Sequence, residues 1–230
     1  MATMSIASIS PLNLFLLGFV VLLLTACGKS DDQLYIHFTS DRDLNQELYM
    51  MNSNGTSQIR LTDNPASDFG VSRSPDGSTF VFYSNREGNF DIYLSGTDMT
   101  NLTRLTNAPG NDLDPDWSHD GNEIVFSTER DGNFEIYVMD ADGSNQIRLT
   151  NTPGNELDPD WSPDGTLIAY SFQGDIYTMH KDGSMQTRLT STSIPEMDPD
   201  WSPDGRIAFT SLRNRDLDLY VINADGTGEE

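Results

Sequence analysis

The stretch Asp158-Pro159-Asp160-Trp161-Ser162-Pro163-Asp164-Gly165 decides the fold, because copies of it recur along the chain. The copies are centred on Trp117, Trp161 and Trp201, and a degenerate copy surrounds Arg73. An Arg-Leu-Thr tripeptide keeps step with them, starting at Arg60, Arg104, Arg148 and Arg188 with spacings of 44, 44 and 40 residues. An aliphatic-Tyr pair does the same, ending at Tyr49, Tyr93, Tyr137, Tyr177 and Tyr220. Self-similarity at such a period indicates a repeat architecture.

Each repeat is expected to contain four short strands separated by turns. In the repeat that the quoted stretch opens, the expected strands are 158–162, 167–171, 175–179 and 186–190. Ser162-Pro163-Asp164-Gly165 has the composition of a tight turn, and Asp182-Gly183 that of a hairpin. No segment shows the 3.6-residue apolar period of a helix. A unit of four strands and 40 to 44 residues predicts an all-β fold built from propeller blades.

The blocks DPDWSPDG and RLT, with IY between them, resemble the TolB-type, WD40-like (PD40) β-propeller repeat over 34–230. The resemblance implies four-stranded antiparallel blades in a ring, six being usual in that family. We expect 18 strands in five units, of which the first lacks an inner strand and the last lacks its Arg-Leu-Thr strand. Either the ring is five-bladed and irregular or the reading frame is truncated. The expected units are 34–62, 63–106, 107–150, 151–190 and 191–230.

The first 26 residues have the pattern of an export signal. Their apolar core, 12–24, is shorter than the roughly 20 residues of a membrane-spanning helix. Leu24-Thr25-Ala26-Cys27 resembles a lipobox, which implies that Cys27, the only cysteine, is lipidated and joined by a tether, 27–33, to the propeller. The alternative is a cysteine that happens to follow the cut, and 1–13 departs from the usual leader because it contains no Lys or Arg. By resemblance, Gly28 implies the outer membrane if the source has two membranes.

The chain is strongly acidic, with a net charge of −23. Such a surface repels phosphate backbones and anionic lipids, and it attracts basic protein surfaces. We therefore expect an envelope protein with a basic surface as partner, contact with the membrane through the lipid anchor only, and no binding of nucleic acid.

Acidic residues recur before each Trp and are the candidate metal ligands. If the first strand lines the central channel, these carboxylates would form a ring able to hold Ca2+. The favoured expectation is that they cap turns and pair with arginines, so that the protein has no cofactor. The candidates are Asp112, Asp114, Glu156, Asp158, Glu196 and Asp198, with Asp68 in the degenerate repeat.

Two further residue types recur and are expected to be structural. Arginines stand seven residues before the repeated Tyr at Arg42, Arg86, Arg130 and Arg213, and each predicts an ion pair with a repeated acid. The fourth unit lacks this arginine because its hairpin at Gln173-Gly174 is four residues shorter. Trp117, Trp161 and Trp201 are expected to pack between blades.

The sequence shows no catalytic set. Its histidines, His37, His119 and His180, stand at different places in their repeats, and there is no Gly-x-Ser-x-Gly motif or P-loop. The favoured hypothesis is a non-catalytic, lipid-anchored envelope scaffold that binds a protein. The alternatives are a propeller enzyme of carbohydrate or peptide breakdown and a truncated fragment without autonomous function.

Overall fold

The computed structural model describes residues 35–213 and 216–230. The expected signal peptide, the lipidation site Cys27 and the tether therefore lie outside the described residues. Those residues contain no helix with the length and hydropathy of a bilayer-spanning segment.

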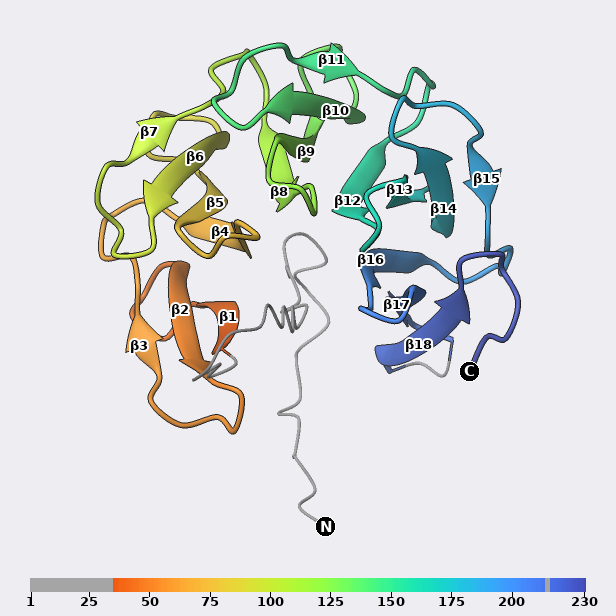
Figure 1. The fold of residues 1–230 in the computed structure, drawn as a ribbon, viewed down its shortest axis with the longest axis horizontal. Helices are drawn as coiled ribbons and strands as arrows, with labels where there is room; N and C mark the ends of the chain where they lie inside the picture. The colour runs from red at the N-terminus through yellow and green to blue at the C-terminus, as the bar shows by residue number, and fades with distance from the viewer. Residues whose placement is uncertain (1–34, 214–215) are drawn as a thin grey trace.

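The described chain forms five antiparallel sheets arranged as blades around a centre (Figure 1). The first blade contains β1 (Tyr35–Ser40), β2 (Glu47–Asn52) and β3 (Ile59–Arg60). The second contains β4 (Asp68–Arg73), β5 (Thr79–Ser84), β6 (Asp91–Gly96) and β7 (Thr103–Arg104). The third contains β8 (Asp112–Trp117), β9 (Glu123–Thr128), β10 (Glu135–Asp140) and β11 (Ile147–Arg148). The fourth contains β12 (Glu156–Trp161), β13 (Leu167–Phe172), β14 (Asp175–His180) and β15 (Thr187–Arg188), and the fifth contains β16 (Glu196–Trp201), β17 (Arg206–Ser211) and β18 (Asp218–Asn223).

The all-β propeller expected from the repeat is confirmed. The three central blades have four strands, while the first lacks the inner strand and the last has three strands among the described residues. The strand bounds differ slightly from the expectation, because the inner strand starts at Glu156 and the outer strand is only Thr187–Arg188. In the last blade, Glu230 exchanges two backbone hydrogen bonds of 3.0 Å with Val221.

Each complete inner strand carries a β-bulge at the first Asp of the Asp-Pro-Asp motif. The pairing register shifts between Leu113 and Asp116, and it shifts at the same place in β12 and β16. Asp114, Asp158 and Asp198 have positive φ angles of 51°, 55° and 52°. In β4 this position is Gly70, with φ of 57°. A non-glycine residue at positive φ is uncommon, and Asp tolerates it better than most.

Apolar side chains between neighbouring sheets form the core. Trp117 packs with Val81, Ile92 and Leu105 of the second blade and with Ile124 of its own. Trp161 and Trp201 occupy equivalent clusters one and two blades further on. The three tryptophans are buried at 8%, 5% and 7% exposure, so they join each blade to the one before it.

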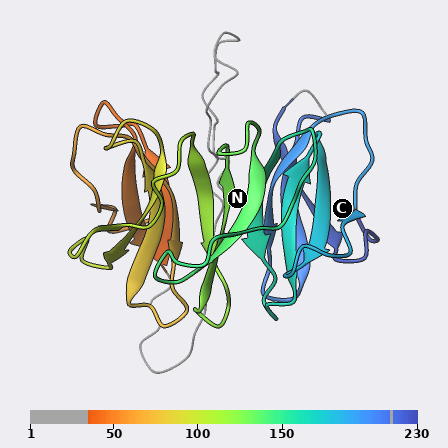
Figure 2. The same cartoon turned by 90° about the horizontal axis from the view of Figure 1, so that it is seen from above.

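The blades follow one another in an arc (Figure 1). Contacts between inner strands join β4 to β8, β8 to β12 and β12 to β16, and β1 contacts β4. Within the described residues, no comparable contact joins the first blade to the last. The strands run between two ends of the molecule, where the connecting loops gather (Figure 2).

Candidate functional site

Two turns of each blade meet at one end of the propeller. In an antiparallel meander the first and third turns lie at the same edge of the sheet. Here the two turns also touch, because Lys181 donates its backbone N–H to Thr166 at 3.2 Å and Ala141 donates to Asn122 at 2.9 Å. In the second, third, fourth and fifth blades, each of these two turns presents one exposed aspartate. We call this set the aspartate face: Asp76, Asp98, Asp120, Asp142, Asp164, Asp182, Asp204 and Asp225.

Each aspartate of this face is held by its own turn. Asp164 accepts hydrogen bonds from the hydroxyls of Ser162 and Thr166, both at 2.7 Å, and from the Thr166 N–H at 3.0 Å. Such bonds favour the ionised carboxylate. Hydroxyl donors, followed by amide or other local donors, therefore lower the pKa of all eight aspartates, in the case of Asp76 to about 2. The face stays ionised at any physiological pH.

Few cations neutralise the aspartate face. Among the ion pairs of residues 35–213 and 216–230, only Asp204 of the eight takes part, with Arg206 at 3.1 Å. The other turn carboxylates accept hydrogen bonds from donors of their own turns and keep their full charge. This end of the molecule is therefore a fixed anionic surface.

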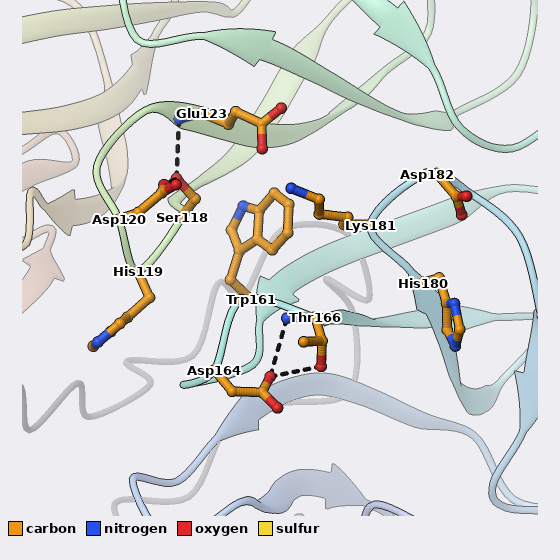
Figure 3. Close-up of a pocket in the computed structure, with 11 residues that line it drawn as sticks. Ser118, His119, Asp120, Glu123, Trp161, Asp164, Thr166, His180, Lys181 and Asp182 are labelled. Carbon is orange, nitrogen blue, oxygen red and sulfur yellow. Dashed lines mark hydrogen bonds between the residues drawn. The ribbon is translucent and has the colours of Figure 1, made fainter.

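A pocket of about 480 Å³ opens on this surface between the third and fourth blades. Trp161 lies at its centre, and Lys181, His180 and His119 come from its two sides (Figure 3). Asp120, Asp164 and Asp182 also line it. Within the described residues, no group of three or more His, Cys, Asp or Glu side chains could hold a metal ion. The pocket combines an aromatic floor with mixed charge.

The opposite end of the propeller uses its acids differently. Here the first residue of the inner strand is a buried acid that faces the hairpin arginine of the same blade. Arg86 binds Asp68 at 2.9 Å, Arg130 binds Asp112 at 3.4 Å, and Arg213 binds Glu196. Each guanidinium also lies over the ring of the repeated Tyr, as Arg130 does over Tyr137 at 4.7 Å. These arginines and acids thus form ion pairs within the second, third and fifth blades.

The Arg-Leu-Thr arginines make a second set of ion pairs at this end. Each binds the buried acid that opens the third strand of its blade, for example Arg148 with Glu135 at 2.5 Å. The same pair recurs as Arg60–Glu47, Arg104–Asp91 and Arg188–Asp175 at 2.6 to 2.8 Å. The repeated arginine of this tripeptide therefore neutralises a carboxylate that is cut off from water.

The fourth blade breaks the pattern, because its short hairpin carries no arginine for Glu156. The Glu156 side chain is 1% exposed and accepts a hydrogen bond from the Thr152 hydroxyl at 2.6 Å. Burial, with the charge of nearby Glu135 adding to it, raises the pKa of Glu156 to about 7. This carboxyl is protonated in acidic conditions and ionises near neutrality.

The acids on the bulge lie close to one another, on the inner strands of neighbouring blades. Burial and the charges of Asp158 and Asp198 raise the pKa of Asp114 well above its ordinary range. Burial and Asp158 raise the pKa of Asp198 to about 7. The Tyr83 hydroxyl reaches Asp114 from the second blade, through the space left by Gly70, where a Cβ would lie 2.4 Å from the Tyr83 ring. Burial and the mutual repulsion of these carboxyls therefore favour their protonated forms.

The second Asp of the Asp-Pro-Asp motif links one blade to the next in the third and fourth blades. Asp116 accepts the backbone N–H of Trp161 at 3.1 Å, and Asp160 accepts that of Trp201 at 2.6 Å. Ser72 takes this place in the second blade, where it accepts the Trp117 N–H at 3.4 Å and donates to Asp116 at 2.8 Å. The second Asp of the motif thus has a structural role that the sequence analysis did not identify.

The candidate metal ligands therefore lie in two places. Asp114, Asp158 and Asp198 lie close to one another on the inner strands, whereas the strand-opening acids are buried at the arginine-rich end. The sequence analysis treated both groups as one ring, because it assumed regular strands and did not anticipate the bulge that separates them. It also missed the aspartate face, although its turns were recognised as turns. The strand-opening acids are Asp68, Asp112, Glu156 and Glu196.

Comparison with known proteins agrees with the repeat and the fold. Residues 100–174 match the family model described as the TolB beta propeller domain. The structure resembles TolB from Acinetobacter baumannii with a TM-score of 0.74 and 23% identity, covering 85% of this chain and 50% of that one. A protein described as TolB from Agrobacterium tumefaciens gives a TM-score of 0.67 and 26% identity, covering 81% and 69%. The expected TolB-type repeat is confirmed over residues 100–174, and this chain spans half the length of the Acinetobacter protein.

The same fold also occurs in an enzyme. An oligogalacturonate lyase in complex with manganese superposes with a TM-score of 0.62 at 12% identity, covering 85% of this chain and 61% of the lyase. At that identity the likeness concerns the fold alone. No curated protein matches this sequence.

Proposed function

We propose that the chain is a non-catalytic scaffold of the bacterial cell envelope that binds a protein with a basic surface through the aspartate face. The observation that carries the proposal is the set of eight exposed, permanently ionised carboxylates at one end of a rigid propeller. Turn loops on a rigid scaffold are frequent sites of recognition. A fixed field of one sign accelerates encounter with an oppositely charged partner.

The acids elsewhere in the molecule support a binding role over a catalytic one. Asp116 and Asp160 hold neighbouring blades together, and the strand-opening acids Asp68, Asp112 and Glu196 are paired with arginines. A residue committed to such a bond is poorly placed to exchange a proton with a substrate. The charges of the aspartate face, by contrast, serve no contact between blades.

The proposed location is the envelope, with the protein held by lipid on Cys27 and, in a source with two membranes, at the outer one. This part rests on the leader sequence and on Gly28. A lipid on Cys27 would tether the propeller beside the membrane without inserting it. The likeness to two TolB proteins supports the same setting.

The test is capture of the partner by two charge-matched double variants. Asp120→Asn with Asp164→Asn removes two charges from the aspartate face, and the Asn side-chain oxygens still accept the turn hydrogen bonds. Asp41→Asn with Glu87→Gln removes two exposed charges from hairpins at the other end. The wild-type chain and both variants, with Cys27 intact, are crosslinked in the host envelope and purified, and the retained proteins are identified by mass spectrometry.

The account predicts that wild-type chain and the hairpin variant retain the same basic partner, while the face variant retains much less of it. Equal retention by both variants would refute the role of the aspartate face. Turnover of an oligosaccharide or peptide by the purified chain, lost on Asp158→Asn, would instead establish the enzymatic alternative.

A further inference from the structure

Among the described residues, no strand pairs with the inner edge of the first blade over 36–40. In Figure 1, β1 is the strand of that blade nearest the centre, and it pairs only with β2. In the second to fifth blades, the equivalent strand has an inner partner that runs antiparallel to it. The backbone groups of 36–40 on that side have no strand partner among the described residues. Such an edge is a template for a further strand.

Arg42 stands at the end of this edge and is held in position. Its guanidinium lies 4.5 Å from the centre of the Tyr49 ring, as Arg86 does over Tyr93 at 4.6 Å. Its Nε donates to the Ser40 hydroxyl at 2.9 Å, and its Nη1 donates to Gln58 at 2.6 Å. The same two bonds, at the same lengths, hold Arg130 in the third blade.

The remaining nitrogen of Arg42 is the one that binds an acid in other blades. Nη2 of Arg86, Arg130 and Arg213 donates to the first residue of the inner strand. Arg42 makes no ion pair within 35–213 and 216–230, so its Nη2 faces the place where that acid would lie. The geometry of three blades therefore specifies what the first blade lacks: an inner strand that begins with Asp or Glu.

In the other blades this acid stands 17 or 18 residues before the arginine, and the corresponding residues before Arg42 are Thr25 and Leu24. Residues 1–30 contain no Asp or Glu. Glu229 and Glu230 are engaged with Arg213 and Arg206. The strands β4, β8, β12 and β16 are inner strands of their own blades, and a second copy could donate one only by opening a blade.

We propose that the inner edge of β1 binds an extended segment of a partner protein, which pairs antiparallel with 36–40 and places an Asp or Glu opposite Ser40, on Arg42. The register follows from the other blades, where the acid pairs with the residue two before the arginine, as Asp112 does with Thr128. Addition of a strand to an exposed edge is a recurrent mode of peptide recognition. This site lies at the end opposite the aspartate face and does not depend on it.

The probe is a labelled peptide with the sequence of residues 153–162, which contains an inner strand of this chain. A second peptide has Gln in place of the residue equivalent to Glu156. Fluorescence anisotropy measures binding of both peptides to the full chain, to Arg42→Gln and to the control Lys181→Gln, which loses a positive charge at the other end. Amide NMR shifts locate the bound peptide, and thermal unfolding verifies that Arg42→Gln is folded.

We expect saturable binding of the acidic peptide to wild-type chain and to Lys181→Gln, with amide shifts in β1. Arg42→Gln, or the Gln peptide, should weaken binding about tenfold, and the two changes together should add little more, because both remove one charged hydrogen bond. The proposal is overturned if no saturable binding occurs or if Arg42→Gln binds as well as wild type. Self-association that protects the β1 amides without peptide would also overturn it, by showing that a second copy occupies the edge.

Discussion

The two ends of the propeller carry the same residue type in opposite conditions. At the arginine-rich end, acids such as Glu135 and Asp112 are fully buried and lie beside guanidinium groups. At the aspartate face, acids such as Asp142 and Asp164 are exposed and are satisfied by hydroxyls and amides of their own turns. A buried carboxylate stays ionised only beside a cationic partner, whereas an exposed turn carboxylate stays ionised without one.

This contrast separates residues that maintain the fold from residues that are free to act. Loss of a partner at the arginine-rich end leaves a charge cut off from water. Loss of a charge at the aspartate face leaves the turn intact if the new side chain still accepts hydrogen bonds. The following changes test that division, beginning with the largest expected effect.

Arg148→Ala should destabilise the protein strongly, while Asp142→Asn in the same blade should not. Arg148 is the ion-pair partner of Glu135, which is 0% exposed, so removing it should lower the free energy of unfolding by about 3 kcal/mol. Asp142→Asn keeps the acceptor for the Ser144 N–H and should change it by less than about 0.5 kcal/mol. Urea unfolding at constant pH measures both, and similar losses would abolish the distinction between the ends.

Asp160 belongs neither to the aspartate face nor to the ion pairs of the arginine-rich end, and it tests a hydrogen bond between blades. Asp160→Ala removes the acceptor for the Trp201 N–H of the next blade and should cost about 2 kcal/mol. Asp160→Asn keeps an acceptor and removes a carboxyl whose pKa burial and Asp116 raise well above the ordinary range, so it should cost little. If urea unfolding gave equal losses for Ala and Asn, the hydrogen bond between blades would not be the stabilising element.

Glu156 tests what happens when a buried acid has no arginine. Because its pKa is raised to about 7 in the fold, the folded state binds the proton more tightly than the unfolded state. The stabilisation is therefore complete below the ordinary Glu pKa and is lost as pH rises through 7. Glu156→Gln should raise the free energy of unfolding at pH 8, by up to about 3 kcal/mol, and leave it nearly unchanged at pH 4. Unfolding measured across this range gives the answer, and a variant with the same pH slope as wild type would contradict it.

Much of the fold could be predicted from the repeat. The spacing of Trp, Tyr and Arg-Leu-Thr predicted five blades. The shortened hairpin at Gln173-Gly174 predicted that the fourth blade lacks the hairpin arginine. Strand ends were less predictable. The outermost strands that end at Arg148 and Arg188 contain only two residues each, and the sequence pattern predicted a longer outer strand.

The candidate site was less accessible to sequence reasoning. An alternating pattern assumes a regular strand, but the strand is bulged at Asp114, whose carboxyl lies beside those of Asp158 and Asp198, while Asp112 pairs with Arg130. A signal was present, because Gly70 occupies the position of Asp114 one repeat earlier, and Gly aligned with Asp indicates positive φ. The aspartate face required the further step of noting that the first and third turns of every blade share one end.

The most direct test of the account is the affinity of the captured partner for the wild-type chain and the two double variants, titrated at low and high salt. The account predicts that Asp120→Asn with Asp164→Asn weakens binding about tenfold at low salt, with a smaller difference at high salt, because screening weakens exposed charges. Asp41→Asn with Glu87→Gln should bind as wild type does, and all three should unfold at the same urea concentration. Equal affinities for the two variants, or a loss of stability confined to the face variant, would contradict the claim that the aspartate face binds the partner without supporting the fold.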